Sequence, residues 1–337
     1  MRIVFLNSLE KRVEGELTSS SQVWIGEEQG LWRIGWDEMG DQESPLWYEG
    51  DSWSEMLHIY RHRLAAKLAE GFRPVIEGIF HEGEAQGSGR TLAAQKLICY
   101  SELHANEELY NELCAWRRRR AAQERKAPYL IASNRLLRMI SAFVPKTSAE
   151  LLQLPGVGEG KSAEYGADLL NITEGASRTH DFPLTWVFSV IDQEVFLSWQ
   201  YKQKEAKYRQ EIEKFNLRRS LMEGVQEGLS LEQLSLRTEL DRREVLEMLE
   251  VLGKEGHSLE PLVALELADT SEAEQNRVWE AYQKLGDEYL KPVLQHVYGP
   301  ERIAAEGEKL ERLYELLRLI RLRYRSQPDS RAVRSAG

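Results

Sequence analysis

The stretch of residues 102–172 constrains the fold more than any other part of the chain, because it alternates helical apolar patterns with proline and glycine breaks. Leu109, Leu113 and Trp116 recur at spacings of four and three, which predicts a helix with one buried face. Pro128 is expected to end this helix, since proline lacks the amide hydrogen that a helix interior needs.

Three further helices are predicted in the same stretch. Asn134 is placed to cap the second, which carries Leu136, Leu137, Ile140 and Phe143 and stops before Pro145. Thr147 and Glu150 have the spacing of a capping box, so a short third helix begins there. The fourth covers residues 161–170 and is expected to bury Ala163, Tyr165 and Leu169. The stretch therefore predicts a small helical bundle.

This pattern resembles the HRDC domain, a helical module of RecQ-type helicases and RNase D. The resemblance implies nucleic-acid binding or domain docking, and no catalysis. The matching positions are Leu113, Trp116-Arg117, Ala127 to Ile131, Leu136, Ile140, Pro145-x-Thr147, Glu150 to Leu152, Leu154-x-Gly156-Val157-Gly158-x-x-Lys161 and Tyr165-Gly166.

The charge distribution points to the same stretch. The chain carries a net charge of -11, which argues against a protein that coats nucleic acid indiscriminately. Residues 102–172 carry ten basic and nine acidic side chains and are the only segment that is not net acidic. Phosphate contacts are therefore expected to concentrate there, with help from the arginines of the C-terminal tail.

The densest basic cluster is the run from Arg117 to Arg120, followed by Arg125 and Lys126. Consecutive arginines spread around most of a helix, so they cannot all face one ligand. Nucleic-acid contact is favoured over a solvated face partly neutralised by nearby glutamates, because arginine suits phosphates. The candidates are Arg117, Arg118, Arg120, Arg125 and Lys126.

The turn Gly156-Val157-Gly158 with Lys161 nearly satisfies the P-loop pattern of nucleotide-binding proteins. That reading is rejected, because Pro155 takes the place of the first glycine and a helix, not a strand, is predicted before the turn. A hairpin between helices fits better. The amides near Gly156 and Gly158, with Lys161, are candidates to hold one phosphate; the alternative is that the glycines only permit the tight turn.

Residues 1–80 are predicted to form a small α+β domain of unknown family. Strands at 22–25 and 31–36 are joined by a hairpin signal at 27–30, with a further candidate strand at 46–48 and a capped helix from Ser52 to Gly71. Its five tryptophans are expected to pack the helix onto the sheet. A base-stacking platform is the less favoured alternative, because this domain is acidic.

The other segments are predicted from composition and helical spacing. Residues 81–101 read as a linker and a lead-in helix, and 173–227 as a linker and helical spacer with an apolar helix at 184–197. Residues from Arg321 onward are expected to be a fraying helix end, and 326–337 a disordered tail.

Residues 228–325 are predicted to contain a helix-turn-helix, with capping boxes at Ser230/Gln233 and Asp241/Glu244. The arrangement resembles the helicase-associated helix-turn-helix domain of some RecQ proteins. Arg242 and Arg243 on its second helix are candidate phosphate contacts. That helix is net acidic, so a protein-binding surface is an equally supported reading.

Several classes of protein are disfavoured by what the sequence lacks. No apolar run is long enough to span a membrane and no signal-peptide order is present, so a cytoplasmic protein is expected. Two unpaired cysteines argue against a disulfide framework or a zinc site. No helicase motor, metal-binding carboxylate set or nucleophilic triad is recognised, so neither catalysis, cofactor nor metal is expected.

The expected fold is mainly α: an α+β domain, then the HRDC-like bundle, then the helix-turn-helix domain. The expected function is a non-catalytic nucleic-acid-binding accessory protein in DNA repair, recombination or other helicase-associated DNA metabolism. Its partners would be single-stranded or partly duplex DNA, with RNA as a second candidate, and a RecQ-type helicase. The main alternative is an adaptor that docks on such a helicase without binding DNA. An enzyme within residues 1–80 is a third, weaker alternative.

Overall fold

The computed structural model describes residues 1–13, 15–38, 45–76, 89–305 and 310–326. Its internal contacts divide the chain into two compact units, residues 1–209 and 210–337. Most described residues are helical and the strands are confined to the first unit, so the mainly α fold is confirmed. No helix in these ranges is both long and apolar enough to cross a membrane.

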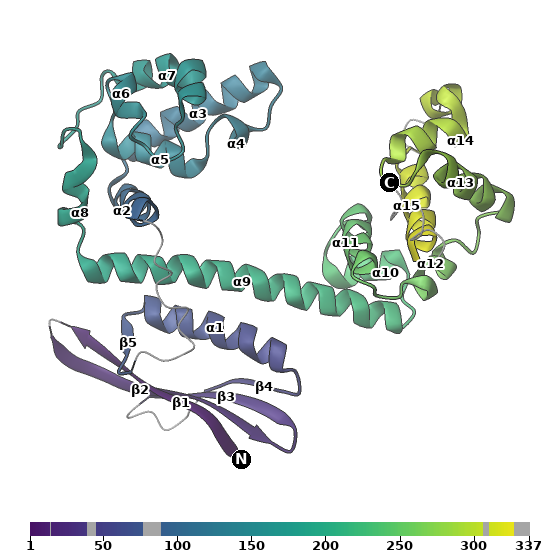
Figure 1. The fold of residues 1–337 in the computed structure, drawn as a ribbon, viewed down its shortest axis with the longest axis horizontal. Helices are drawn as coiled ribbons and strands as arrows, with labels where there is room; N and C mark the ends of the chain where they lie inside the picture. The colour runs from purple at the N-terminus through teal and green to yellow at the C-terminus, as the bar shows by residue number, and fades with distance from the viewer. Residues whose placement is uncertain (14, 39–44, 77–88, 306–309, 327–337) are drawn as a thin grey trace. The chain divides into compact units, whose positions relative to one another are not determined.

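The first unit begins with an antiparallel sheet of five strands in the order β4-β3-β2-β1-β5 (Figure 1). The predicted hairpin joins β2 to β3, where Gln29 and Gly30 both have positive φ. Ile3 and the apolar residues that follow it lie in β1, a strand of 12 residues. The strands are β1 (Arg2–Val13), β2 (Glu16–Glu28), β3 (Leu31–Glu38), β4 (Leu46–Gly50) and β5 (Phe72–Pro74).

Helix α1 (Trp53–Ala69) packs on one face of this sheet and is capped by the Ser52 hydroxyl, which accepts from the Glu55 amide. Trp36 is buried beneath it and stacks on Trp47 with ring centroids 5.2 Å apart. The favoured role of these tryptophans, packing the helix onto the sheet, is what the contacts show. Trp24 lies instead over Gly35, where a Cβ atom would collide with the indole ring.

Six helices form the bundle predicted for residues 102–172 and its lead-in segment. Leu113, Leu137 and Ile140 are fully buried at its centre. The helices are α2 (Gly89–His104), α3 (Glu107–Glu124), α4 (Pro128–Ile131), α5 (Asn134–Phe143), α6 (Ser148–Leu151) and α7 (Glu159–Thr173).

Three details of this bundle differ from expectation. Pro128 does not end a helix but is the first residue of α4. Proline is favourable at this position, because the amide hydrogen that it lacks would have no partner within the helix anyway. Ser133, not Asn134, caps α5 by accepting from the Leu136 amide. Ala163 is exposed, whereas Tyr165 and Leu169 are buried as predicted.

The apolar helix predicted for residues 184–197 is wrong as a single element. A 3₁₀ turn (Leu184–Trp186) and α8 (Val187–Val190) are followed by a break at Ile191, whose backbone is extended. Asp192 then accepts from the Val195 amide and starts a new helix, α9 (Gln193–Gln226). The break reflects the capping preference of aspartate, which competes with helix continuation.

The second unit packs the end of α9 with six further helices around a leucine-rich core. Both predicted capping boxes form, at the starts of α10 and α11. The helices are α10 (Leu231–Thr238), α11 (Arg242–Lys254), α12 (Glu260–Glu266), α13 (Glu272–Leu285), α14 (Leu290–Ala305, kinked at Gly299) and α15 (Leu310–Ser326).

The fraying predicted from Arg321 onward is wrong, because α15 continues to Ser326. Arg321 is buried and bonds to Glu250 of α11, while Arg325 bonds to Asp287. These partners lie far away in sequence, so the local pattern does not reveal them. Residues 81–88 of the linker and lead-in helix predicted at 81–101, and residues 327–337 of the tail predicted at 326–337, lie outside the described residues.

Candidate nucleic-acid interface

Helices α3 and α7 lie side by side and run antiparallel. Trp116 of α3 donates its indole N–H to Asp168 of α7 at 3.1 Å. Two turns later along α3, Glu124 accepts from the hydroxyl of Tyr165, an earlier residue of α7, at 3.0 Å. The hairpin that precedes α7 therefore lies at the C-terminal end of α3. We call this region, made by Arg125, Lys126, Tyr129, Gly156, Gly158 and Lys161, the hairpin end.

Arg125 and Lys126 sit where α3 ends. Arg125 has φ 53°, and its side chain is exposed with no carboxylate in ion-pair reach among the described residues. Lys126 is exposed too, but its ammonium lies 2.8 Å from Glu124 and 3.5 Å from Glu164. Arg125 is thus available to an anion, whereas Lys126 already has partners.

The carboxylate of Glu124 bonds to side chains of both helices where the end of α3 meets α7. Hydrogen bonds from Lys126, and then from Arg120, lower the pKa of Glu124 to about 2. The same pairing raises the pKa of Lys126 above its ordinary value. Glu124 therefore stays ionised at neutral pH and ties the end of α3 to α7.

The backbone of the hairpin between α6 and α7 is open to close approach by a phosphate. Gly156 has φ 94°, which favours glycine, and Gly158 caps α7 without any side-chain hydrogen bond. A Cβ atom at either glycine would meet open space, so nothing in the structure covers these backbone groups. The first amides of α7 have no acceptor within the helix, and Lys161 has no carboxylate partner in the described part of the chain. Amides and ammonium can hold one phosphate between them.

The arginines of α3 are dispersed, as their spacing predicts. Arg117 is half-buried and donates to the backbone carbonyl of Ala132 at 2.8 Å, so it braces α4. Arg120 lies 2.5 Å from Glu124 and over the Tyr165 ring. Arg118 is exposed and touches only a carbonyl of its own helix, at 3.4 Å. The structure thus brings Arg125 and Lys126 to the hairpin end and leaves Arg117 in a structural contact.

Sequence reasoning missed one residue at this end, Tyr129. Its side chain is 70% exposed, while Ile131 two residues later is 1% exposed and anchors α4. An exposed aromatic ring offers a face on which a nucleic-acid base can stack. The sequence Pro-Tyr-Leu-Ile could have revealed this residue. With Pro128 at the first position, it predicts a short helix in which only one position is buried and Tyr129 is exposed.

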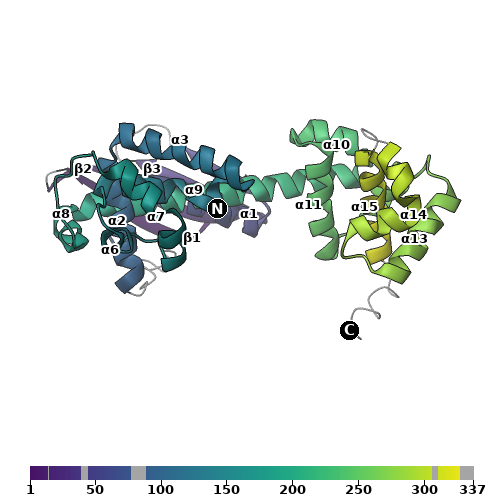
Figure 2. The same ribbon diagram turned by 90° about the horizontal axis from the view of Figure 1, so that it is seen from above.

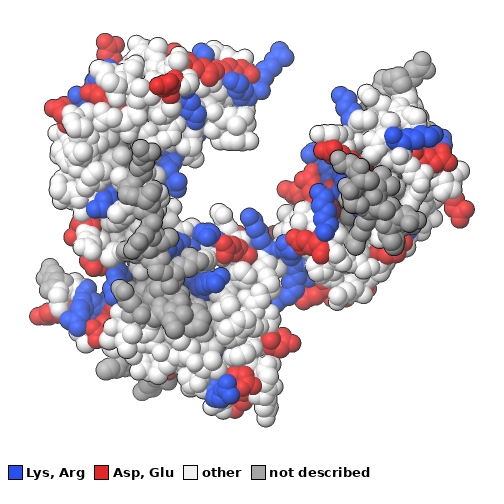
Figure 3. All heavy atoms as spheres, viewed as in Figure 1, with Lys and Arg blue, Asp and Glu red and all other residues white. Residues whose placement is uncertain are grey.

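Basic side chains do not form a continuous field over this bundle. Figure 3 shows lysines and arginines interleaved with acidic side chains on the face in view. Ion pairs such as Arg138 with Glu107 at 3.1 Å account for part of this mixing. Cations without a carboxylate partner in the described ranges, among them Arg125 and Lys161, therefore matter more than the total charge.

Arg242 and Arg243 lie in the second unit and are both paired. Arg242 contacts Glu315 at 2.5 Å and Glu266 at 3.3 Å, and Arg243 contacts Glu247 at 3.0 Å. The acidic side of α11 is bound to α15 through Arg318 and Arg321. The ribbons of these two helices lie within the same unit (Figure 2). Helix α11, which the sequence predicts to be the second helix of a helix-turn-helix, is thus packed against its own unit.

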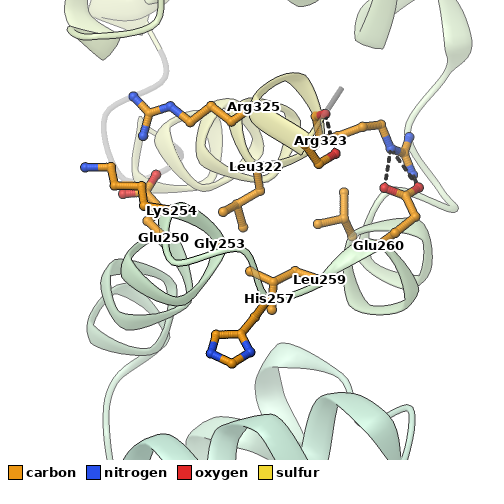
Figure 4. Close-up of a pocket in the computed structure, with 11 residues that line it drawn as sticks. Glu250, Gly253, Lys254, His257, Leu259, Glu260, Leu322, Arg323 and Arg325 are labelled. Carbon is orange, nitrogen blue, oxygen red and sulfur yellow. Dashed lines mark hydrogen bonds and ion pairs between the residues drawn. The ribbon is translucent and has the colours of Figure 1, made fainter. Parts of the chain in front are cut away.

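A small pocket opens where the C-terminal end of α11 meets α12 and α15 (Figure 4). It holds about 30 Å³, room for little more than a water molecule, and Arg323 is paired with Glu260 at 2.8 Å beside it. Within the described ranges, no group of three or more histidine, cysteine or acidic side chains is placed to hold a metal ion.

Comparisons with known proteins agree with the bundle. The HRDC domain model matches residues 106–173. The ATP-dependent DNA helicase RecQ of Bacillus subtilis is 30% identical over 121 residues, which is 34% of this chain and 20% of the helicase. The ATP-dependent DNA helicases UvrD2 of Mycobacterium bovis and Mycobacterium tuberculosis are 28% identical over 102 residues, 26% of this chain and 15% of theirs. No solved structure matches the chain.

Proposed function

We propose that this chain is a non-catalytic accessory protein that binds nucleic acid at the hairpin end of its HRDC domain. Single-stranded or partly duplex DNA is the preferred partner and RNA a second candidate. The HRDC match and the DNA helicases that share this segment support a role in helicase-associated DNA metabolism, including repair or recombination. A cytoplasmic location and a separate RecQ-type helicase partner belong to the same proposal.

One arrangement carries the proposal: the contacts between α3 and α7 place the bare N-terminus of α7 and Lys161 towards the C-terminal end of α3, where Arg125 lies and the exposed Tyr129 follows in α4. Tyr129 can stack on a base, while Arg125 and Lys161 neutralise phosphates. The glycines let the backbone amides approach the same phosphates. Sequence-tolerant binding is expected, because none of these groups reads a base edge.

The test is the anisotropy of a fluorescein-labelled single-stranded DNA 20-mer titrated with the full chain. Arg125→Glu with Lys161→Glu should weaken binding at least tenfold. The matched control, Lys284→Glu with Lys291→Glu, makes the same charge change at two exposed lysines of the second unit and should have a small effect. Equal losses in both double variants would overturn the assignment. Competition with unlabelled RNA shows whether the chain binds DNA or RNA more tightly.

The alternative function is an adaptor that docks on a helicase and binds no DNA. It is favoured by the second unit, where both candidate arginines of α11 are already neutralised. A chain that fails to bind the 20-mer at low salt, yet recovers a purified RecQ-type helicase in a pull-down, would support the adaptor. ATPase and nuclease assays on the full chain test the non-catalytic part of the proposal.

A further inference from the structure

A groove in the second unit is independent of the hairpin end. It runs between the turn that joins α10 to α11, the start of α13 and the outer face of α15, and has a volume of about 1,320 Å³. Pockets for small molecules commonly enclose about 300–1,000 Å³ and are more closed. The groove is therefore sized for a segment of protein.

The floor of the groove is apolar. Leu246 and Leu319 are 1% and 3% exposed and lie at its base, with the half-buried Leu290 and Leu316 above them. Leu236 stands on the wall with 77% of its side chain exposed. Leu236, with the half-buried Leu290 and Leu316, gives the groove an apolar surface that a partner can cover.

The walls of the groove are acidic once internal pairing is considered. Two arginines of the groove form ion pairs within the unit: Arg242 pairs with Glu315 and Glu266, and Arg318 pairs with Glu247 and Glu250. Arg243 likewise binds Glu247, which leaves Arg312 as the one lining arginine without a carboxylate partner in the described ranges. Four lining carboxylates form no ion pair in the described ranges: Glu232, Asp241, Glu274 and Glu311. Of these, Asp241 and Glu311 lie near enough to Arg243 to help raise its pKa.

We infer that this groove binds a basic amphipathic helix of a partner protein. An apolar floor accepts anchor side chains at positions i, i+4 and i+7 of such a helix, and acidic walls attract lysines or arginines on either side of them. A phosphate backbone would meet the same four carboxylates and be repelled. The inference thus goes beyond nucleic-acid binding and assigns the helix-turn-helix unit a protein partner.

The test uses the full chain and a fluorescein-labelled 15-residue helical peptide with leucine at every third or fourth position and lysine or alanine elsewhere. Leu236→Glu removes an exposed anchor and should leave the fold intact, and Glu232→Lys with Glu311→Lys reverses two wall charges. Each is expected to raise the Kd at least tenfold. A peptide with glutamate in place of each lysine should bind at least tenfold more weakly than the basic one.

Leu265→Glu is the matched control, because Leu265 is 48% exposed on α12 and does not line the groove. It should leave peptide binding unchanged. Equal losses in Leu236→Glu and Leu265→Glu, or equal binding of the two peptides, would overturn the inference. So would a wild-type dimer in sedimentation that only Leu236→Glu dissociates, since a second copy would then fill the groove. Binding of the DNA 20-mer should be unaffected by Leu236→Glu, which separates this inference from the proposed function.

Discussion

The hydroxyl of Tyr165 donates a hydrogen bond to Glu124 at 3.0 Å, which ties the first half of α7 to the C-terminal end of α3. Because α3 and α7 run antiparallel, the glycine hairpin and Lys161 lie towards the same end of the domain as Arg125, although all of α4, α5 and α6 separate Arg125 from Lys161 in sequence. The candidate interface exists because of this antiparallel pairing. It does not depend on a high local density of basic residues.

Tyr129→Ala should weaken binding of single-stranded DNA without loss of stability. The ring is 70% exposed, so its removal leaves no cavity. Stacking of a base on an aromatic side chain contributes roughly 1–3 kcal/mol, which corresponds to a loss of about fivefold to a hundredfold in affinity. Fluorescence anisotropy measures the affinity. Tyr289→Ala, at a tyrosine 68% exposed in the second unit, is the control, and a similar loss there would contradict the prediction.

Lys161→Gln should reduce the salt dependence of binding. Each phosphate contact to a single strand contributes a slope of about -0.7 to the plot of log K against log salt concentration. Loss of one contact should therefore make the slope shallower by about 0.7, measured by anisotropy between 50 and 200 mM salt. A variant that binds more weakly with an unchanged slope would place Lys161 away from the phosphates.

Arg117→Ala should destabilise the domain and leave the DNA affinity of the folded protein almost unchanged. The guanidinium of Arg117 donates to the Ala132 carbonyl at 2.8 Å in a half-buried position, and hydrogen bonds from charged groups contribute about 1.5–3 kcal/mol. Urea unfolding measures the change. Arg118→Ala, one residue along on the exposed side, should alter stability by less than about 0.5 kcal/mol. The reverse order would show that Arg117 is not a brace.

Arg321→Met should destabilise the second unit more than Arg321→Met combined with Glu250→Met. Arg321 and Glu250 are 8% and 11% exposed and pair with each other, and removal of one member of a buried pair costs about 3–5 kcal/mol. Removing both leaves Arg318 with Glu247, so part of the loss should be recovered. Denaturant unfolding of the single and double variants is the measurement. Additive losses would mean that the two residues are not coupled.

The stabilisation of the folded state by the hydrogen bonds of Glu124 should decrease only at acidic pH. Hydrogen bonds from Lys126 and Arg120 lower the pKa of Glu124 to about 2, against about 4.3 in an unfolded chain. A lowered pKa stabilises the folded state above the unfolded value, and this stabilisation is lost as the pH falls from about 4.3 towards 2. The difference in Tm between wild type and Glu124→Gln should be constant from pH 7 to 5 and shrink below pH 4. A difference that does not change with pH would contradict this.

Sequence patterns predicted the elements whose determinants are local. The spacing of Leu109, Leu113 and Trp116 placed the buried face of α3, and the capping residues Ser230 and Asp241 located α10 and α11. The mainly α class followed from the same periodicities. The role of Pro128 was predicted wrongly, because proline occurs both after the end of a helix and at its start. The burial of Ile131 and the exposure of Tyr129 in the structure distinguish the two cases.

The state of several candidate cations could not be predicted in full, because some of their partners lie far away in sequence. Arg242 is neutralised by Glu315 and Glu266, and Arg120 by Glu124 and Asp168. Local composition ranks all arginines equally, whereas tertiary packing leaves only some of them available. Arg321 was misplaced for the same reason, since its partner Glu250 fixes the end of α15.

Hydrogen–deuterium exchange of the full chain, with and without a saturating single-stranded DNA 20-mer, tests the central claim most directly. Bound DNA should slow exchange in peptides that cover residues 125–131 and 156–161, and the peptides of α11 should be unaffected. Slower exchange in α11 or in the N-terminal sheet, with no change at the hairpin end, would contradict the proposed interface.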